Sequence, residues 1–507
     1  MRAQRLSRGA ARAAAAAALA YLAYVLIRYA GLDGYLDHME PNIAIPAWLW
    51  LGGRPLYPAA GAEADFVTTY GPLSYLIGAG VYSLAGGSIA ASKAGPLLAA
   101  ALAIVVFAIT LLRRPGGALA AIAVVAFAGF MALFSPHAFW NRPDPYLILL
   151  VTVALASLPR TETSAQGLAP AIVIAVAIGL AVDLKAHAFV FFLPVIARLW
   201  AVTPTAANAF RLGAVIAAVS LATALAPFAL PGVSLADYVA NMTRFVAGVG
   251  GSAEVFWKSL RYGALLLAPV VALAILAARR CDAVLAREAF CVGVLVLSLG
   301  LLLYPASRPG SGAHQLMPLF PVAVDALLRL GRAAHSRAPL VGAWFAAFAL
   351  GLVVISVPVQ KRLHRQFAVI EARAAASDVR AVIATLGEDE TVEMGFGATL
   401  TRYHDTFVRP LLIFAGQPFT FEAMTVMELK GVGQRVPARF AAHVGICETN
   451  IWMIPKGEAP FAMSSYWGDG PVFDEVFRKG FLDAYRRDRA SRLFDVWRCK
   501  LGAAATP

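Results

Sequence analysis

The chain has 507 residues, of which 60% are hydrophobic and only 14% are charged, and its mean hydropathy is +0.69. A soluble globular protein carries about 25% charged residues, because most of its charged side chains cover a surface in water. The composition therefore excludes a soluble enzyme, a disordered protein and a simple nucleic-acid-binding protein, although the formal net charge is +13. It indicates an α-helical polytopic membrane protein.

Apolar stretches that approach the roughly 20 residues needed to cross a bilayer recur up to residue 358. We expect about eleven transmembrane helices. They lie near residues 11–30, 92–112, 117–135, 145–159, 168–184, 188–201, 211–230, 262–278, 288–304, 316–330 and 339–357. The Arg-rich start also resembles a signal peptide, but no small-residue cleavage site follows its long apolar run, so we expect it to be retained.

Basic residues indicate the orientation of these helices, because Lys and Arg accumulate in cytoplasmic loops. With the N-terminus inside, most Lys and Arg residues before residue 358 fall on the inner side, among them Arg12 and Arg113. Most of the acidic residues before residue 358, such as Asp37 and Asp144, fall outside. We therefore expect a cytoplasmic N-terminus and an odd number of spans.

The composition changes after residue 358, where nearly half of the 43 basic and more than half of the 30 acidic residues lie. An odd number of spans places this segment on the outer face. Short runs at 391–394, 443–446 and 450–454 predict strands, and 474–487 has the spacing of an amphipathic helix. The segment is therefore expected to form a mixed α/β domain.

We accordingly divide the chain into a transmembrane module, residues 1–357, and an extracytoplasmic α/β domain, residues 358–507. Cys447 and Cys499 lie in this domain, where an oxidising compartment permits a disulfide. Two lone cysteines are also commonly unpaired core residues, so the sequence leaves both interpretations open.

The first outer loop, about residues 31–91, is the longest connection in the transmembrane module. Its apolar run 73–85 is too short to span and is expected to lie at the interface or to re-enter. Asp37 and Glu40 are three residues apart, so on a helix they would share a face. Such a carboxylate could be the general base that removes a proton from an acceptor hydroxyl. Loop solvation or helix capping near Pro41 is the alternative.

Polar side chains follow spans three, five and nine on the same outer face: Arg142, Asp144, Asp183, Lys185, His187, Arg308 and His314. Each could instead be an interfacial anchor or an ion pair, since a Lys or Arg at a helix end commonly extends towards the head groups. Basic groups opposite an acidic pair suit an anionic lipid head group, because Lys and Arg both neutralise phosphate.

At these residues the chain resembles the C-type (GT-C) glycosyltransferases of membranes. These include the protein O-mannosyltransferases, the lipid A aminoarabinose transferase and bacterial relatives that use polyprenyl-phosphate sugars. The resemblance covers the transmembrane module as an ordered pattern that follows the acidic motif after span one: GRPLY at 53–57, YGPL at 70–73, RPD at 142–144, Lys185, and HQLMPLFP at 314–321.

The resemblance implies an inverting transfer of a sugar from a polyprenyl-phosphate donor to a glycan, lipid or protein acceptor of the cell envelope, in a bacterial inner membrane. It assigns the base to Asp37. The family often has adjacent Asp and Glu here, whereas two residues separate Asp37 from Glu40, so either could be the base. Asp144 matches the second acidic position, and Lys185 matches the residue that contacts the donor phosphate. Further candidates are His187, Arg308 and His314 for the phosphate and Arg54, Tyr70 and Arg142 for the substrate.

A divalent cation could be held by Asp37, Glu40 and Asp144, although no spacing demands one. The main alternative function is a transporter or lipid flippase, which would place ionisable groups near the bilayer midplane. A ligase that moves whole glycan chains is a further alternative. The enzymatic interpretation requires Asp37, Asp144 and Lys185 to meet around one cavity on the outer face, and it needs no nucleic acid partner.

Overall fold

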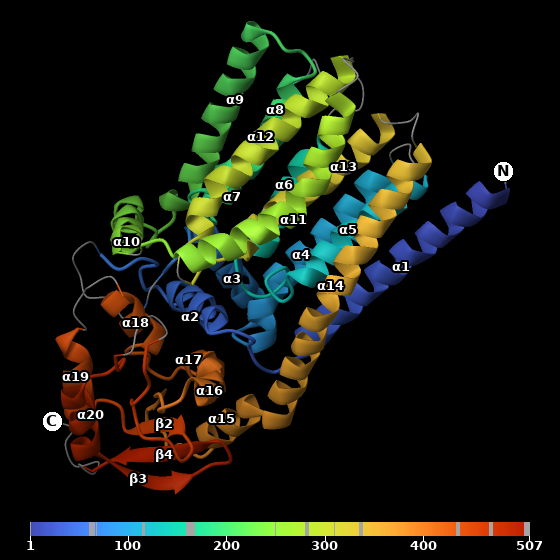
Figure 1. Cartoon of the computed structure of the whole chain (residues 1–507). Coiled ribbons are helices and arrows are strands. Elements are labelled where there is room, and N and C mark those ends of the chain that lie inside the picture. The colour runs from blue at the N-terminus through green and yellow to red at the C-terminus, as the bar shows by residue number, and fades with distance from the viewer. Residues whose placement is uncertain are drawn as a thin grey trace.

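A bundle of helices makes up one part of the molecule, and a smaller C-terminal region with a β-sheet lies at one end of it (Figure 1). Part of the first outer loop, residues 60–65 and 67, is outside the described residues. The computed structural model describes residues 2–59, 66, 68–113, 117–158, 168–248, 250–278, 283–308, 310–333, 338–431, 437–465 and 470–500.

Eleven helices of the described residues coincide with the eleven predicted spans: α1 (Arg2–Ala30), α4 (Ile89–Leu112), α5 (Ala118–Leu133), α6 (Asp144–Ala156), α7 (Ala169–Val182), α8 (Leu193–Trp200), α9 (Ala206–Leu225), α11 (Ala253–Ala278), α12 (Ala283–Ala306), α13 (Phe320–Ala333) and α14 (Ala338–Arg373). Within the described residues, six helical stretches are long and apolar enough to cross a membrane. These features are those of a multi-pass membrane protein, and the count of eleven spans stays a prediction.

Three further helices lie at the end of the bundle next to the C-terminal region: α2 (Met39–Leu51), α3 (Pro72–Ala85) and α10 (Leu235–Gly248). Short 3₁₀ helices occur as well: η2 (Ala188–Phe192), η3 (Ala226–Ala229) and η4 (Ala313–Leu319). At 1.5 Å per residue, the 14 residues of α3 extend only about 21 Å, which is shorter than the roughly 30 Å of a hydrocarbon core. This length agrees with the prediction of an interfacial segment.

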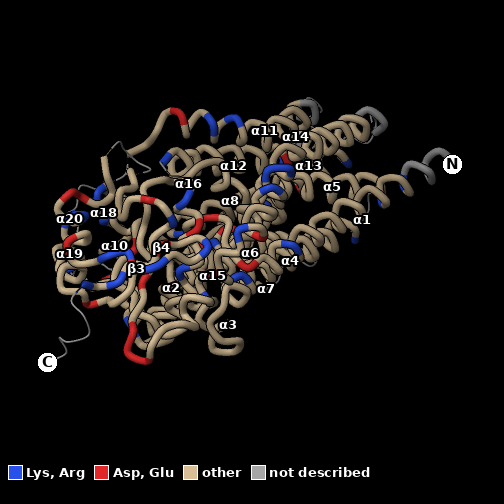
Figure 2. Tube along the Cα trace, turned by 90° about the horizontal axis from the view of Figure 1, so that it is seen from below, with Lys and Arg blue, Asp and Glu red and all other residues tan. Residues whose placement is uncertain are grey.

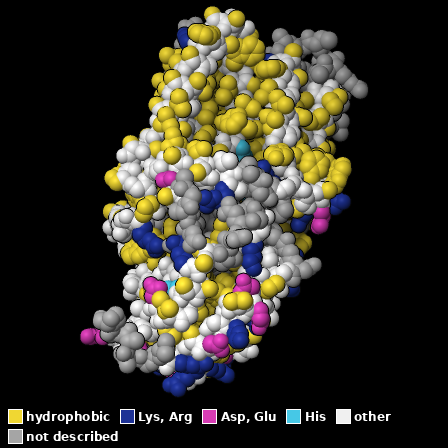
Figure 3. Space-filling model, turned by 90° about the vertical axis from the view of Figure 1, so that its left-hand side faces the viewer, with side chains coloured by type: hydrophobic (Ala, Val, Ile, Leu, Met, Phe, Trp, Pro, Cys, Tyr) yellow, Lys and Arg dark blue, Asp and Glu magenta, His cyan; other side chains and the backbone are white. Residues whose placement is uncertain are grey.

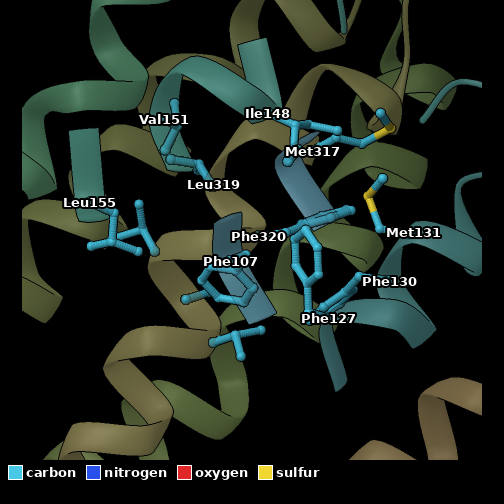
Figure 4. Packing of buried hydrophobic residues seen from close by; sticks show 14 of the residues in the cluster. Phe107, Phe127, Phe130, Met131, Ile148, Val151, Leu155, Met317, Leu319 and Phe320 are labelled. Atoms are coloured by element: carbon cyan, nitrogen blue, oxygen red, sulfur yellow. The ribbon is translucent and has the colours of Figure 1, made fainter. Parts of the chain in front are cut away.

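The interior of the bundle is apolar and rich in aromatic rings (Figure 4). Phe107 of α4 lies 4.4 Å from Phe127 of α5, measured between ring centroids, and Phe130 of α5 stacks on Phe320 of α13 at 4.6 Å. Several alanines of α5 are fully buried, among them Ala121, Ala123 and Ala126. Small residues allow membrane helices to approach closely, which accounts for the central place of α5.

Charge and hydrophobic surface are divided between the two parts of the molecule. Lys, Arg, Asp and Glu are frequent in the C-terminal region and sparse along the helices of the bundle (Figure 2). On the face shown in Figure 3, hydrophobic side chains cover the bundle, and charged side chains gather below it. Large apolar side chains such as Leu98 and Phe210 are 60% and 80% exposed, as expected of residues that face lipid.

The C-terminal region contains a four-stranded sheet in the order β1-β2-β4-β3, in which β1 and β2 are parallel and the other pairs are antiparallel. Its helices and strands are α15 (Ala375–Ile383), β1 (Val392–Met394), α16 (Leu400–Tyr403), η6 (His404–Val408), α17 (Pro410–Phe414), α18 (Ala423–Gly431), α19 (Ala438–Gly445), β2 (Ile451–Pro455), α20 (Glu475–Ala484), β3 (Tyr485–Ala490) and β4 (Phe494–Cys499). Strands β1 and β2 coincide with two predicted runs.

The predicted strand at 443–446 is wrong, because most of this stretch belongs to helix α19. Phe440, His443 and Val444 are buried there at the i, i+3 and i+4 spacing of one helical face. The predicted helix at 474–487 ends earlier, at Ala484, where the chain enters β3.

Helix α14 runs without a break through residue 357, where the sequence suggested a domain boundary. The C-terminal region also contacts α2: Arg409 donates to Asn42 over 2.5 Å and to Glu422 over 2.8 Å. Cys447 and Cys499 form a disulfide that joins the turn after α19 to the end of β4. This result decides between the two interpretations that the sequence left open for these cysteines.

Candidate functional site

A cavity of about 420 Å³ lies at the end of the bundle next to the C-terminal region. Its lining comes from segments that are far apart in the sequence: the start of α2, the loop before α3, the α5–α6 and α7–η2 connections, α10, the α12–η4 connection and α18. Seven predicted site residues line it: Asp37, Tyr70, Arg142, Lys185, His187, Arg308 and His314. Polar loops at the ends of apolar helices therefore build one pocket.

Lys185 is held at the cavity wall by two buried partners. Its Nζ donates to Oδ1 of Asp144 over 2.7 Å and to Oε1 of Gln315 over 2.9 Å. Asp144 is 1% exposed and does not line the cavity. The ammonium is thus fixed from behind by an acid and an amide, while the lysine faces the cavity. This geometry gives Asp144 contact with Lys185 rather than with a bound substrate.

The YGPL motif packs directly on the turn that carries Lys185. The backbone N–H of Gly71 donates to the carbonyl of Leu184, and that of Leu73 donates to the carbonyl of Asp183. A Cβ on Gly71 would lie 2.2 Å from the Asp183 carbonyl oxygen, so only glycine fits at this approach. The motif therefore fixes the distance between Tyr70 and Lys185.

Arg142 is oriented by two aromatic residues. Its Nε and Nη2 donate to the Tyr70 hydroxyl over 3.2 and 3.1 Å, and its guanidinium lies 4.9 Å from the centroid of Trp140. Arginine stacks well on aromatic faces because its planar cation is weakly hydrated. These contacts hold a fixed positive charge at the cavity wall, opposite the loop that carries Asp37.

Asp37 precedes α2, and its Oδ1 accepts a hydrogen bond from the N–H of Met39 over 2.9 Å. It lines the cavity, and its side chain is 25% exposed. Burial alone would raise the pKa of Asp37, but the charges of His38 and Arg142 outweigh this effect and lower it below its usual range. The carboxylate is therefore ionised near neutral pH.

Glu40 points away from the cavity and is fully buried. It accepts hydrogen bonds from the Tyr29 hydroxyl, from the N–H groups of Leu36 and Asp37, and from the N–H of Asn141. The expectation that Asp37 and Glu40 share a helical face is wrong, because α2 begins only at Met39. Glu40 joins the Asp37 loop to the connection between α5 and α6.

Several imidazoles lie around the same cavity. His137 stacks on His314 with ring centroids 4.5 Å apart. Burial, reinforced by the charge of Arg142, lowers the pKa of His137 to about 4. Burial and the charge of Lys185 lower the pKa of His187 to about 4 as well. Both rings are therefore neutral at pH 7 and can donate or accept a hydrogen bond.

Several side chains that line the cavity were not expected from the sequence, among them His137, Tyr238, Met242, Met424 and Glu428. Glu428 and Met424 come from α18 in the C-terminal region. Burial, together with the charge of Glu422, raises the pKa of Glu428 to about 7. His137 lies three residues before Trp140, within a polar connection that was already suspected, so this residue could have been found from the sequence.

Two of the expected roles do not fit this geometry. Arg54 is exposed on the loop after α2 and does not line the cavity. Asp37, Glu40 and Asp144 do not converge on a common point, because Glu40 bonds to Tyr29 and Asp144 bonds to Lys185. Within the described part of the chain, no group of three His, Cys, Asp or Glu side chains is arranged to hold a metal ion.

Solved structures with a similar fold are known. The structure of ArnT from Cupriavidus metallidurans in the apo state aligns over 95% of this chain and 97% of its own, with a TM-score of 0.59 and 15% sequence identity. The structure of the same protein bound to undecaprenyl phosphate aligns over 96% and 98%, with a TM-score of 0.60 and 14% identity.

The chain has the GT-C fold. The agreement extends over nearly the whole chain, so it includes the C-terminal region as well as the bundle. The sequence matches no protein-family model and no curated protein. At 14–15% identity the likeness concerns the fold alone, and the chemistry of this GT-C chain has to be argued from its own cavity.

Proposed function

We propose that this protein is a membrane glycosyltransferase that moves a sugar from a polyprenyl-phosphate carrier to a hydroxyl group of a cell-envelope glycan, lipid or protein. One observation carries the proposal: the ionised carboxylate of Asp37 and the cations of Lys185, Arg142 and Arg308 line one cavity at the end of a membrane bundle. The likeness to ArnT, which has a structure with bound undecaprenyl phosphate, supports the lipid-linked donor.

The proposed reaction needs one base and a stabilised leaving group. The acceptor hydroxyl attacks the anomeric carbon of the sugar, and Asp37 takes its proton as the new C–O bond forms. The bond between that carbon and the phosphate oxygen breaks on the opposite side, which inverts the anomeric centre. The polyprenyl phosphate leaves with the electron pair, and the charges of Lys185, Arg142 and Arg308 stabilise it.

Glu40 and Asp144 act through other residues in this mechanism. Glu40 accepts the N–H of Asp37 and thereby orients the loop that carries the base. Asp144 holds the ammonium of Lys185 and keeps it charged in a buried place. His187 and His314 are neutral donors or acceptors beside the phosphate, and Tyr70 positions Arg142.

We further propose that the protein lies in a bacterial inner membrane with its N-terminus in the cytoplasm and its C-terminal region on the outer side. The bond between Cys447 and Cys499 supports this orientation, because disulfides persist in oxidising compartments. The cavity lies at the end of the bundle that would then face outwards. A transporter would need its ionisable groups near the midplane instead.

Replacement of the base is the direct test. In full-length protein reconstituted with extracted polyprenyl-phosphate sugars, Asp37→Asn should lower transfer by at least about 100-fold, since a positioned base contributes about 10²–10⁴-fold. Asp33→Asn is the matched control, because Asp33 lies on the same loop but pairs with Arg380 outside the cavity. Wild-type turnover by Asp37→Asn would reject the assignment.

Loss of a phosphate contact should have a different kinetic effect. Lys185→Ala should raise the KM for the lipid donor, because it removes a charge that binds the phosphate before and during transfer. Lys258→Ala, which changes an exposed lysine of α11, is the control. An unchanged donor KM with full activity would contradict the role of Lys185.

The product distinguishes the proposed transferase from the two alternatives. Mass spectrometry of envelope glycans from a deletion strain should show the loss of a single hexose or pentose. Loss of a whole polymer would indicate a glycan ligase. Unchanged glycans with altered solute uptake would indicate a transporter.

A further inference from the structure

A second and larger cavity runs along the bundle between α1, α5 and α14. Its volume is about 1900 Å³, and it shares no lining residue with the cavity that contains Asp37. Pockets for drug-sized ligands measure only about 300–1,000 Å³. The lining is mostly apolar and lies mainly on α1, α5 and α14, of which α1 and α14 are long and apolar enough to cross a membrane. We call this space the α1–α14 groove.

Small side chains create the walls of the α1–α14 groove. On α1 these are Ala10, Ala11, Ala14, Ala17 and Ala18, and on α14 they are Gly342, Ala343, Ala346 and Ala349. Such residues normally let helices pack closely. Here α1 and α14 each pack on α5, and the space between them stays open over α5.

The two ends of the groove differ. Near the C-terminal region, α1 and α14 are joined: the Tyr21 hydroxyl donates to Oε1 of Gln360 over 2.8 Å, and Arg28 pairs with Glu371 over 2.7 Å. Towards the N-terminus the two helices separate (Figure 1). At that open end the lining includes Arg8 of α1 and Arg332 at the end of α13.

Arg332 lacks the partners that its neighbour has. Its Nε and Nη2 are buried and make no hydrogen bond within the described part of the structure. Arg329, one turn earlier, pairs with Glu288 over 3.0 Å and with Asp325 over 2.6 Å. Buried donors without partners are costly, and a guanidinium fork matches the oxygens of a phosphate. An anionic group at the open end would satisfy Arg332.

We propose that the α1–α14 groove binds an anionic phospholipid from the leaflet at the N-terminal end of α1. Its phosphate lies between Arg8 and Arg332, and its acyl chains lie along the alanines of α1 and α14. The cavity that contains Asp37 lies at the opposite end of the bundle and shares no lining residue with this groove. The site is thus separate from the proposed transfer reaction.

The charge contribution is tested by native mass spectrometry of the full-length protein purified in detergent and incubated with phosphatidylglycerol or phosphatidylcholine. Wild-type protein should retain phosphatidylglycerol preferentially. Arg332→Gln should reduce this retention at least about tenfold, since it removes a charge-assisted hydrogen bond to the phosphate. Arg211→Gln, at an exposed arginine of α9 outside the groove, should leave it unchanged.

The shape of the groove is tested without a change of charge. Ala14→Trp places an indole ring in the groove and should also weaken lipid binding, whereas Ala13→Trp, at an exposed neighbour outside the groove, should not. A thermal melt of each variant shows whether it is folded. If Arg332→Gln is unfolded, the two tryptophan variants still test the proposal. Equal retention of both lipids, equal retention by both tryptophan variants, or a bound polyprenyl phosphate in place of the phospholipid would overturn the proposal.

Discussion

The groups that build the cavity wall are held in place by specific hydrogen-bond partners. Lys185 has Asp144, the N–H of Asp37 has Glu40, and Arg142 has Tyr70. A buried charge without a partner is strongly destabilising, so each partner is needed for the fold as well as for the site. The sequence identified the residues that line the cavity better than it identified these supporting roles.

The sequence predicted that Asp37 and Lys185 lie on the same side of the membrane. This prediction followed from the distribution of Lys and Arg between the loops, which indicates the helix ends that share a side. It could not separate the roles of Asp37 and Glu40. Their roles depend on where α2 begins, and Pro41 with Pro46 obscures the helical pattern there. Sequence spacing alone therefore found the acidic pair but did not show that only one of its members reaches the cavity.

A buried histidine in the C-terminal region has an electrostatic setting unlike that of His137. His443 lies 2.9 Å from Glu393 through Nε2 and 2.7 Å from Glu448 through Nδ1. Burial alone would lower the pKa of His443, but the hydrogen bonds and charges of the two glutamates outweigh this effect and raise it above 6.5. The ring thus joins α19 to β1, and its charged form is favoured by both glutamates.

Stability of the full chain should therefore depend on pH through His443. Because its pKa is raised in the folded state, its contribution is present in full below about pH 6.5 and is lost as the pH rises through the folded-state pKa. The protein should therefore be less stable at alkaline pH than at mildly acidic pH. Thermal unfolding in detergent at about pH 5.5 and about pH 8.5 measures the change. His443→Gln should flatten this difference, and an equal pH dependence in that variant would contradict the prediction.

At the scale of secondary-structure elements, the site depends on loops that contact each other closely rather than on the long helices. The loop before α3 and the turn after α7 meet through backbone hydrogen bonds at Gly71. Long apolar runs predicted the helices, because a stretch of about 20 apolar residues in a membrane almost always forms a spanning helix. The contact between the loops could not be predicted, because it depends on how α3 packs beside the bundle.

A single methyl group should disturb this contact. Gly71→Ala places a Cβ 2.2 Å from the Asp183 carbonyl oxygen, so the two loops have to separate. We expect a stability loss of about 1–3 kcal/mol, together with a fall in transfer activity as Tyr70 moves away from Arg142. Gly80→Ala in α3 is the control, because a Cβ there has nothing within 4 Å. Thermal melts and transfer assays of the two variants should differ clearly.

At the scale of the whole molecule, the C-terminal region forms part of the cavity wall through Met424 and Glu428. No pattern in the sequence links α18 to Asp37, because the contact arises only when the two parts of the chain pack together. The predicted α/β composition of this region followed from its charge and its short aromatic runs. That this region forms one wall of the cavity became apparent only from the structure.

Two arginines that join the parts of the molecule allow a matched comparison. Arg409 is buried and bonds to Asn42 and Glu422, whereas Arg380 pairs with Asp33 where both side chains are about half exposed. Arg409→Gln should cost about 3–5 kcal/mol, because Glu422 is left buried without its cation. Arg380→Gln should cost no more than about 1 kcal/mol.

Thermal unfolding of both variants in detergent provides the measurement, and limited proteolysis reports whether the C-terminal region separates from α2. Equal costs for the two substitutions would show that burial of the ion pair does not determine how firmly the two parts are joined.

Helix α14 has a consequence for the height of the C-terminal region. Its 36 residues extend about 54 Å at 1.5 Å per residue, whereas a hydrocarbon core is only about 30 Å thick. The helix is therefore longer than a bilayer core is thick, and its C-terminal end leads into α15 of the C-terminal region. It thereby holds the C-terminal region at a set distance from the bundle, where Met424 and Glu428 of α18 complete the cavity wall.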